Sequence, residues 1–110
     1  MKTFVKRSPL TGMPMPIGWG NGYVIIPKGH PLHGKDYEDI DINVHGGLTF
    51  SESAETLLDE WDEISPEDRE GWVVGFDTAH YGDDDTTWDY SAVVAETERL
   101  CDQIMNYKHK

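Results

Sequence analysis

One long amphipathic pattern near the C-terminus constrains the fold of this 110-residue chain more than any other feature. Val93, Leu100 and Ile104 recur at helical spacing, and Ser91 stands where an N-cap is expected, so the sequence predicts a helix over residues 92–107. A helix with one apolar stripe must bury it against another layer. The other apolar segments are mostly of strand type, and we therefore expect an α+β fold in which this helix packs on a small, mainly antiparallel sheet.

Short apolar segments predict the strands of that sheet. Residues 23–26 are β-branched and aromatic and are closed by a proline, while residues 72–76 are continuously apolar, which is typical of a buried strand. Residues 39–44 alternate polar and apolar side chains, as in a strand with one solvated face, and residues 48–50 resume in extended form.

The remaining segments are expected to be irregular or only briefly helical. Residues 8–22 contain four glycines and three prolines, so we expect an irregular N-terminal segment over residues 1–21. A short second helix is predicted near residues 54–61, with Ser51 or Ser53 as its cap. The length fits a single domain over residues 1–110.

The acidic residues dominate the charge and are unevenly placed. Twenty-one Asp and Glu against nine Lys and Arg give a net charge of −12, and twenty of the acids fall within residues 36–98, where Arg69 is the only Lys or Arg. Such a chain repels nucleic acid and anionic membranes, which argues against direct binding to either. A basic protein partner or a bound cation is the better expectation. A solvated acidic face that merely keeps a small domain soluble is the competing interpretation.

Targeting and cysteine patterns are consistent with a cytoplasmic protein. No apolar stretch reaches the length of a membrane span, and the first residues lack the apolar core of a signal peptide. Cys101 is the single cysteine, so no internal disulfide can form.

Several histidines lie at predicted strand ends and in loops, where small domains assemble binding sites. His45 ends the alternating segment, and His80 follows Asp77 by three residues, with Asp83 three further on. Imidazoles and a carboxylate from separate segments can ligate zinc, and an ion would help a small domain that lacks disulfides. The spacing alone leaves a second interpretation open, in which His45 hydrogen-bonds the backbone and Asp77 caps a turn.

Three motifs carry a resemblance to a known family. The chain contains Gly-His-Pro from Gly29, His-Gly-Gly-Leu-Thr-Phe from His45, and Gly-Phe-Asp-Thr-Ala-His from Gly75, followed by Gly82 and Asp83. Over roughly residues 20–105 it resembles small phage and prophage proteins, and it looks like a zinc-containing anti-CRISPR protein directed at a type II, Cas9-type effector. The resemblance implies a structural zinc and binding rather than turnover. The ligands that it implies are His30, His45, Asp77 and His80, with Asp83 in support.

The sequence leaves three functions open, one favoured and two alternative. The favoured hypothesis is a phage-encoded inhibitor that docks an acidic surface on a Cas9-type effector and blocks nucleic-acid loading. The alternatives are a metal-dependent hydrolase acting on a nucleotide or signalling molecule, and an accessory domain that binds a small ligand in a Trp-lined pocket. The carboxylates expected to contact the effector are Asp59, Glu60, Asp62, Glu63, Glu67, Asp68, Glu70, Asp83, Asp84 and Asp85.

Overall fold

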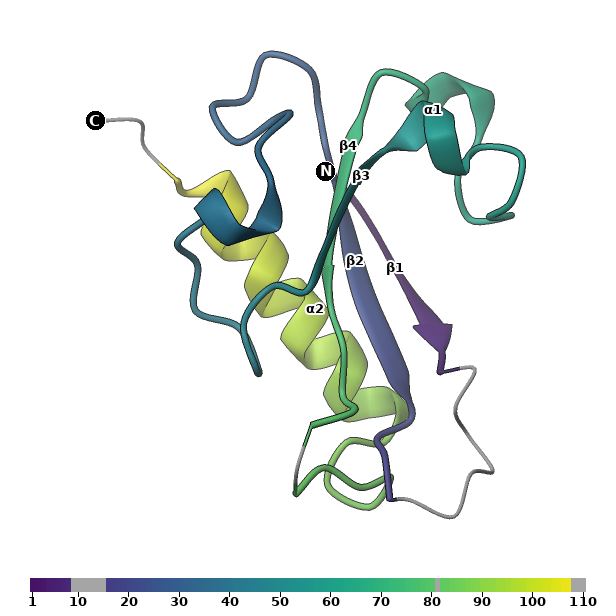
Figure 1. Cartoon of the computed structure of the whole chain (residues 1–110), viewed down its shortest axis with the longest axis vertical. Coiled ribbons are helices and arrows are strands. Elements are labelled where there is room, and N and C mark those ends of the chain that lie inside the picture. The colour runs from purple at the N-terminus through teal and green to yellow at the C-terminus, as the bar shows by residue number, and fades with distance from the viewer. Residues whose placement is uncertain (9–15, 81, 108–110) are drawn as a thin grey trace.

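A computed structural model describes residues 1–8, 16–80 and 82–107 of the chain (Figure 1). It confirms the predicted α+β fold, with a four-stranded antiparallel sheet and a C-terminal helix packed on it. The elements in chain order are β1 (Lys2–Arg7), β2 (Gly20–Ile26), the 3-10 helix η1 (Tyr37–Asp39), β3 (Phe50–Ser53), α1 (Ala54–Leu57), the 3-10 helix η2 (Pro66–Asp68), β4 (Trp72–Phe76) and α2 (Tyr90–Met105).

The strands follow the order β1-β2-β4-β3, so the two most apolar strands occupy the middle of the sheet. Val24 of β2 pairs with Val74 of β4, and Phe4 of β1 pairs with Tyr23. The predicted strand over residues 72–76 is confirmed as β4. Its continuous apolar run is explained by burial, because both faces of the central strands are covered.

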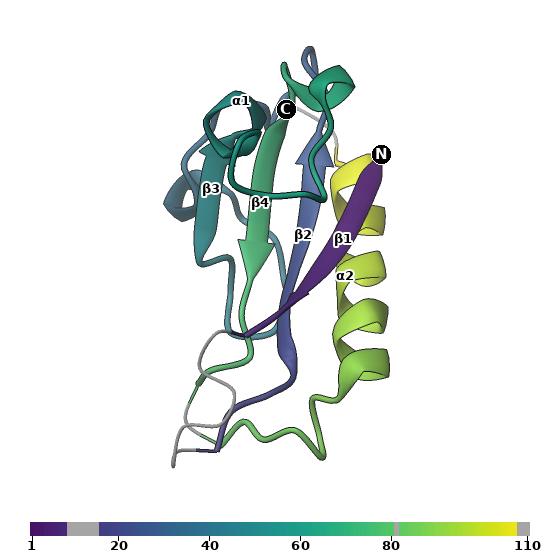
Figure 2. The same cartoon turned by 90° about the vertical axis from the view of Figure 1, so that its right-hand side faces the viewer.

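The sheet separates two apolar cores. Helix α2 lies on one face, and α1 with the chain that leads through η2 lies on the other (Figure 2). Alternate residues of the central strands enter alternate cores, as the two-residue period of a strand requires. The α2 side contains Val24, Ile26, Val74, Phe76, Val93, Leu100 and Ile104, and the α1 side contains Tyr23, Ile25, Val73, Ala54, Leu57 and Ile64.

Helix α2 confirms the predicted stripe but not the predicted cap. Val93, Leu100 and Ile104 have no exposed surface. The helix begins at Tyr90, and Asp89 caps it by accepting a hydrogen bond from the Ala92 backbone N–H at 2.9 Å. Asp and Ser are similarly good N-caps, so Asp89 can take this role two residues before the predicted Ser91.

The irregular segment predicted over residues 1–21 is wrong at both of its ends. Lys2–Arg7 forms the edge strand β1, and β2 begins at Gly20 rather than at residue 23. Gly20 lies so close to the backbone of Lys6 that a side chain would not fit, and Gly22 lies as close to Phe76. Glycine therefore marks close packing inside this sheet rather than a break in it.

The strand predicted over residues 39–44 is also wrong. Asp39 ends η1, and residues 40–44 continue as irregular chain on the α2 side of the sheet, with Ile40 and Val44 buried in the core. The Asn43 backbone N–H donates to the Gln103 side chain, which donates back to the Asn43 carbonyl at 2.7 Å. A helix side chain thus satisfies backbone groups that a neighbouring strand would otherwise satisfy.

The short helix near residues 54–61 is confirmed in position but is shorter than expected. Helix α1 covers Ala54–Leu57, and Ser53 caps it by accepting a hydrogen bond from the Thr56 N–H at 3.2 Å. The chain then turns so that Trp61 packs near Phe4 and Tyr23 on the α1 side of the sheet.

Candidate metal centre

Three side chains from two segments converge beyond the C-terminal end of β4. His45 lies in the turn that follows Val44, and His80 and Asp83 lie in the chain between β4 and α2. Figure 1 shows this chain at the end of the sheet opposite α1. One potential ligand atom from each of the three residues lies within 4.8 Å of the others, so the group could hold a metal ion.

Asp83 is the centre of this group and is only 5% exposed. Its Oδ1 lies 2.9 Å from His45 Nε2, and its Oδ2 lies 3.1 Å from His80 Nδ1. Oδ2 also accepts a hydrogen bond from the His80 backbone N–H at 3.0 Å. Burial alone would raise the pKa of Asp83, but the hydrogen bonds from His45 and His80 outweigh it and hold the pKa below its usual value. Asp83 is therefore an ionised ligand candidate at neutral pH.

His45 is positioned by two contacts and by the turn that follows it. Its backbone N–H donates to Glu96 of α2 at 2.7 Å, and its ring lies against Trp88 with 4.1 Å between ring centroids. The following residues, Gly46 and Gly47, both have positive φ angles, of 69° and 80°. This tight turn directs the imidazole back toward Asp83.

His80 is fixed between two carboxylates. Its Nδ1 faces Asp83, and its Nε2 lies 3.1 Å from Oδ1 of Asp77. The ring also rests against Gly46, where a Cβ atom would collide with it. The glycine at position 46 is thus required both by its φ angle and by the imidazole beside it.

The donor set fits zinc. Two imidazole nitrogens and one carboxylate oxygen are common zinc ligands, and ligands of a tetrahedral ion lie about 3.3 Å apart for bonds of about 2.0–2.1 Å. Asp83 lies 2.9–3.1 Å from the two imidazoles, and all three potential ligand atoms lie within 4.8 Å of one another, so the side chains must move relative to one another to surround an ion. The His45 and His80 side chains are 25% and 33% exposed, so one side of the group is open to solvent.

The structure rearranges the predicted ligand set. His45 and His80 come together as expected, but Asp83 joins them, and Asp77 contacts His80 from behind. The structure does not bring His30, the remaining predicted ligand, into this group. His30 Nε2 lies 2.9 Å from the Ile104 carbonyl, and its Nδ1 accepts from the Leu32 N–H at 3.1 Å. Nε2 of His30 therefore joins its loop to the C-terminal end of α2, and Nδ1 holds the loop itself together.

Two residues support this group: Trp88, whose ring lies against that of His45, and Glu96, which accepts a hydrogen bond from the His45 backbone N–H. Acidic and aromatic residues at these positions carry no spacing signal toward a histidine about 40–50 residues away. The His-Gly-Gly sequence was the one available sign, because consecutive glycines indicate a turn with unusual backbone angles.

The predicted partner-binding carboxylates fall into two groups. Six of them have partners within the fold, four of these in contacts with basic groups: Asp83 as described, Asp68 with Lys2 at 2.8 Å, Glu63 with Lys6 at 3.1 Å, and Glu70 with Lys28 at 3.6 Å. Asp84 accepts from the Thr86 and Thr87 N–H groups, and Glu67 accepts from the Ser65 hydroxyl. Asp59, Glu60, Asp62 and Asp85 are exposed, and no described residue bonds to their side chains.

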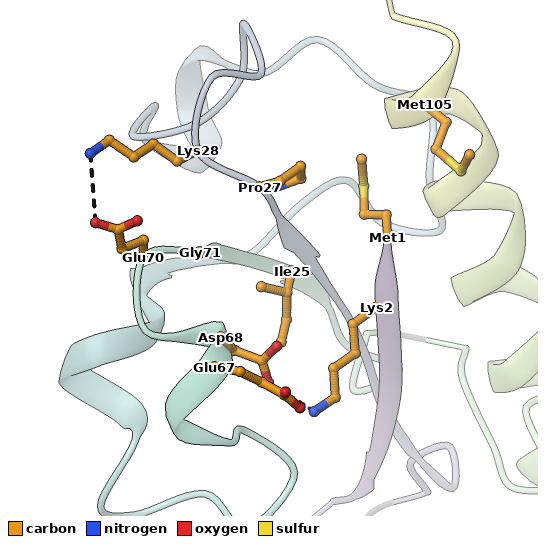
Figure 3. Close-up of a pocket in the computed structure, with 10 residues that line it drawn as sticks. All are labelled: Met1, Lys2, Ile25, Pro27, Lys28, Glu67, Asp68, Glu70, Gly71 and Met105. Atoms are coloured by element: carbon orange, nitrogen blue, oxygen red, sulfur yellow. Dashed lines mark hydrogen bonds and ion pairs between the residues drawn. The ribbon is translucent and has the colours of Figure 1, made fainter.

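A separate cavity of about 490 Å³ lies between β1, β2 and η2 (Figure 3). Its apolar part includes Ile25, Pro27 and Met105, and the Lys28–Glu70 ion pair crosses its rim. No tryptophan is among the described residues that line it, so it does not provide the Trp-lined pocket of the third hypothesis.

Comparison with known proteins gives no relative. No family model matches the chain, and no curated protein or solved structure is significantly similar to it. Among the described residues, no helix has both the length and the apolar character needed to cross a membrane.

Proposed function

We propose that this protein is a zinc-stabilised inhibitor that binds the basic nucleic-acid-loading surface of a Cas9-type effector. The observation that carries the proposal is the group of three exposed carboxylates after α1, Asp59, Glu60 and Asp62, which no described residue neutralises. We call this group the acidic turn. The motif resemblance supplies the class of partner.

The neighbouring ion pairs support this assignment. Lys2 and Lys6 of β1 pair with Asp68 and Glu63, so these two bases are already used within the fold. Charge remains unbalanced at the turn itself. Exposed carboxylates of this kind attract arginine and lysine side chains as phosphate groups do, and they raise association rates.

The metal group serves stability in this proposal. It lies at the opposite end of β4 from the acidic turn (Figure 1). A zinc ion held by His45, His80 and Asp83 would join the turn after Val44 to the chain between β4 and α2. A small domain without disulfides gains most from such a cross-link, since its core alone is marginal.

Binding at two salt concentrations tests the proposal. We expect the affinity for a Cas9-type effector to fall steeply between 50 and 500 mM salt, because exposed charges are screened over about 10 Å at 0.1 M. Guide RNA, added first, should prevent binding. Affinity that does not change with salt, or binding that guide RNA leaves intact, would contradict the proposal.

A matched pair of triple variants locates the contact. Replacing the acidic turn (Asp59→Asn, Glu60→Gln, Asp62→Asn) should weaken effector binding about tenfold or more, as expected for the loss of three favourable charge contacts. The control replaces Asp41, Glu98 and Asp102, which are also exposed, with their amides and makes the same change in net charge. Equal losses in both variants would mean that total charge, and not the acidic turn, determines binding.

A metal-dependent hydrolase is the second candidate, and the partial exposure of His45 and His80 favours it. Zinc sites with three protein ligands and an open position are typically catalytic, and there the ion supplies a Lewis acid. Hydrolysis of chromogenic phosphate mono- and diesters by zinc-loaded protein tests this candidate. Turnover that is abolished in His45→Ala would support it, and the absence of turnover above that variant would reject it.

A further inference from the structure

We infer that Asp77 is a positioning residue that makes His80 bind metal through Nδ1. This inference rests on the metal group of the proposed function but not on the effector. It gives Asp77, predicted as a ligand, the role of holding a ligand in place.

The contacts around His80 fix which nitrogen faces which carboxylate. Nε2 lies 3.1 Å from Asp77 Oδ1, and Nδ1 lies 3.1 Å from Asp83 Oδ2. Asp83 is also the residue that His45 Nε2 approaches. The space shared by the three potential ligands therefore lies on the Nδ1 side of the His80 ring, and Asp77 lies on the other side.

Asp77 is itself held in place. It directly follows β4, and its Oδ1 accepts a hydrogen bond from the Ala79 backbone N–H at 3.3 Å. This short turn carries His80 around so that its ring returns to the same oxygen. Gly46 lies so close to the ring that a Cβ atom at this position would collide with the imidazole.

These contacts match a general feature of metal sites. A metal-binding histidine donates its other ring N–H to a carboxylate or carbonyl, which fixes both the tautomer and the ring orientation. If zinc binds Nδ1, the ring proton of His80 resides on Nε2, which faces Asp77 Oδ1 at 3.1 Å. Loss of such a supporting group lowers metal affinity by about 10–100-fold.

His45 is held by other means. Its Nε2 faces Asp83, and its ring is placed by the tilted contact with Trp88 rather than by a second carboxylate, since no described residue bonds to His45 Nδ1. The two histidines thus bind through different nitrogens. This difference can be observed directly in the wild-type protein.

Zinc titrations of Asp77 variants test the inference. We expect Asp77→Ala to weaken zinc binding by about 10–100-fold, and Asp77→Asn to recover most of the loss because its amide oxygen still accepts from Nε2–H. Asp85→Ala, which removes a nearby exposed carboxylate without a described partner, is the control and should change the affinity less than threefold. Equal affinities for wild type and Asp77→Ala would overturn the inference.

Ring nitrogen chemical shifts give a second test that needs no variant. In the zinc-loaded protein, ¹⁵N NMR should show His80 bound through Nδ1 with Nε2 protonated, and His45 bound through Nε2. Binding of His80 through Nε2 would overturn the inference even if Asp77→Ala fails to fold. Failure to bind an effector would overturn the proposed function alone, because both of these measurements use the protein and zinc without a partner.

Discussion

The two ends of β4 use carboxylates in opposite ways. Beyond Phe76, Asp83 is nearly buried and is fixed by two imidazoles and a backbone N–H. On the way from α1 to Trp72, the acidic turn exposes three carboxylates that no described residue contacts. The same chemical group is a preorganised ligand in one place and a diffuse surface charge in the other.

Burial explains the difference. A buried carboxylate is stable only when several donors surround it, and the same arrangement presents it to a cation. An exposed carboxylate keeps its hydration, is screened by salt, and contributes little to the fold. We therefore expect the metal-centre end to control stability and the acidic turn to control association, and the predictions below test that separation.

Zinc should produce the largest effect. At a zinc concentration about a thousand times its dissociation constant, binding to the folded state adds about 4 kcal/mol, which corresponds to a rise in Tm of about 10–20 °C. Differential scanning calorimetry with zinc, and again after addition of a chelator, measures the shift and its reversal.

Histidine variants show whether this effect comes from the proposed group. His45→Ala should abolish the zinc-dependent rise in Tm. His30→Ala should lower the starting Tm, because it removes the hydrogen bond to the Ile104 carbonyl, yet keep the full zinc-dependent rise. If His30→Ala abolishes the rise and His45→Ala does not, the ligand set described here is wrong.

Alanine substitutions at Gly46 and Gly47 should give the next largest effects, and the two should differ in zinc affinity. Both have positive φ, so alanine at either position costs about 1–2 kcal/mol of strain. At Gly46 the new methyl group also collides with the His80 ring, whereas nothing lies within 4 Å of the equivalent position at Gly47. Gly46→Ala should therefore weaken zinc binding at least tenfold, while Gly47→Ala should lower Tm but keep the zinc affinity, as measured by titration calorimetry. Equal zinc affinities would show that His80 does not depend on Gly46.

The fold was largely predictable from the sequence where the hydrophobic pattern of a segment matched the way in which that segment is buried. The continuous run of residues 72–76 fits a strand covered on both faces, and the stripe of α2 fits a helix covered on one. Residues 39–44 alternate polar and apolar side chains as a strand does, but they do not form a strand. Their apolar side chains are buried, but Gln103 bonds the backbone where a strand would have done so. Alternating polar and apolar residues indicate which side chains are buried, but they do not show that a neighbouring strand is available to pair with the backbone.

The candidate site was predictable in part. His45 and His80 lie beside turns at the end of the sheet, which is where the sequence suggested a site. Asp77 and Asp83 stand three residues before and three after His80, so spacing treats them alike. The backbone of the connecting turn decides which of them faces His45, and that backbone is a tertiary feature. His30 is a different case. It lies in a loop, but its side chain contacts the Ile104 carbonyl and does not point toward His45 and His80.

Asp68, the last residue of η2, should have a smaller effect on stability, and this effect should depend on pH. Burial would raise its pKa, but hydrogen bonds from Lys2 and Ser65 outweigh burial and lower the pKa below its ordinary value of 3.8. The stability that ionised Asp68 contributes is therefore present above about pH 4 and is lost as pH falls through the lowered folded-state pKa. Asp68→Asn should reduce the free energy of unfolding by about 0.5–1 kcal/mol at pH 7.

Urea denaturation across pH measures this effect. The difference between wild type and Asp68→Asn should shrink between about pH 4 and pH 2, because the wild-type carboxylate becomes protonated there. Asp62→Asn, which removes an exposed carboxylate without a described partner, is the control and should show no such pH dependence. A constant difference for Asp68→Asn at all pH values would show that its charge does not support the fold.

The acidic turn itself should have the smallest effect on stability. Replacing Asp59, Glu60 and Asp62 with their amides should change Tm by less than about 2 °C, since exposed groups without partners rarely contribute more. Any change should be an increase at low salt that disappears at 500 mM, because removing like charges relieves repulsion that salt otherwise screens. The zinc-dependent rise in Tm should be the same as in wild type. A large loss of stability, or a loss of zinc binding, would mean that the two ends of β4 are coupled and that the division of roles proposed here does not hold.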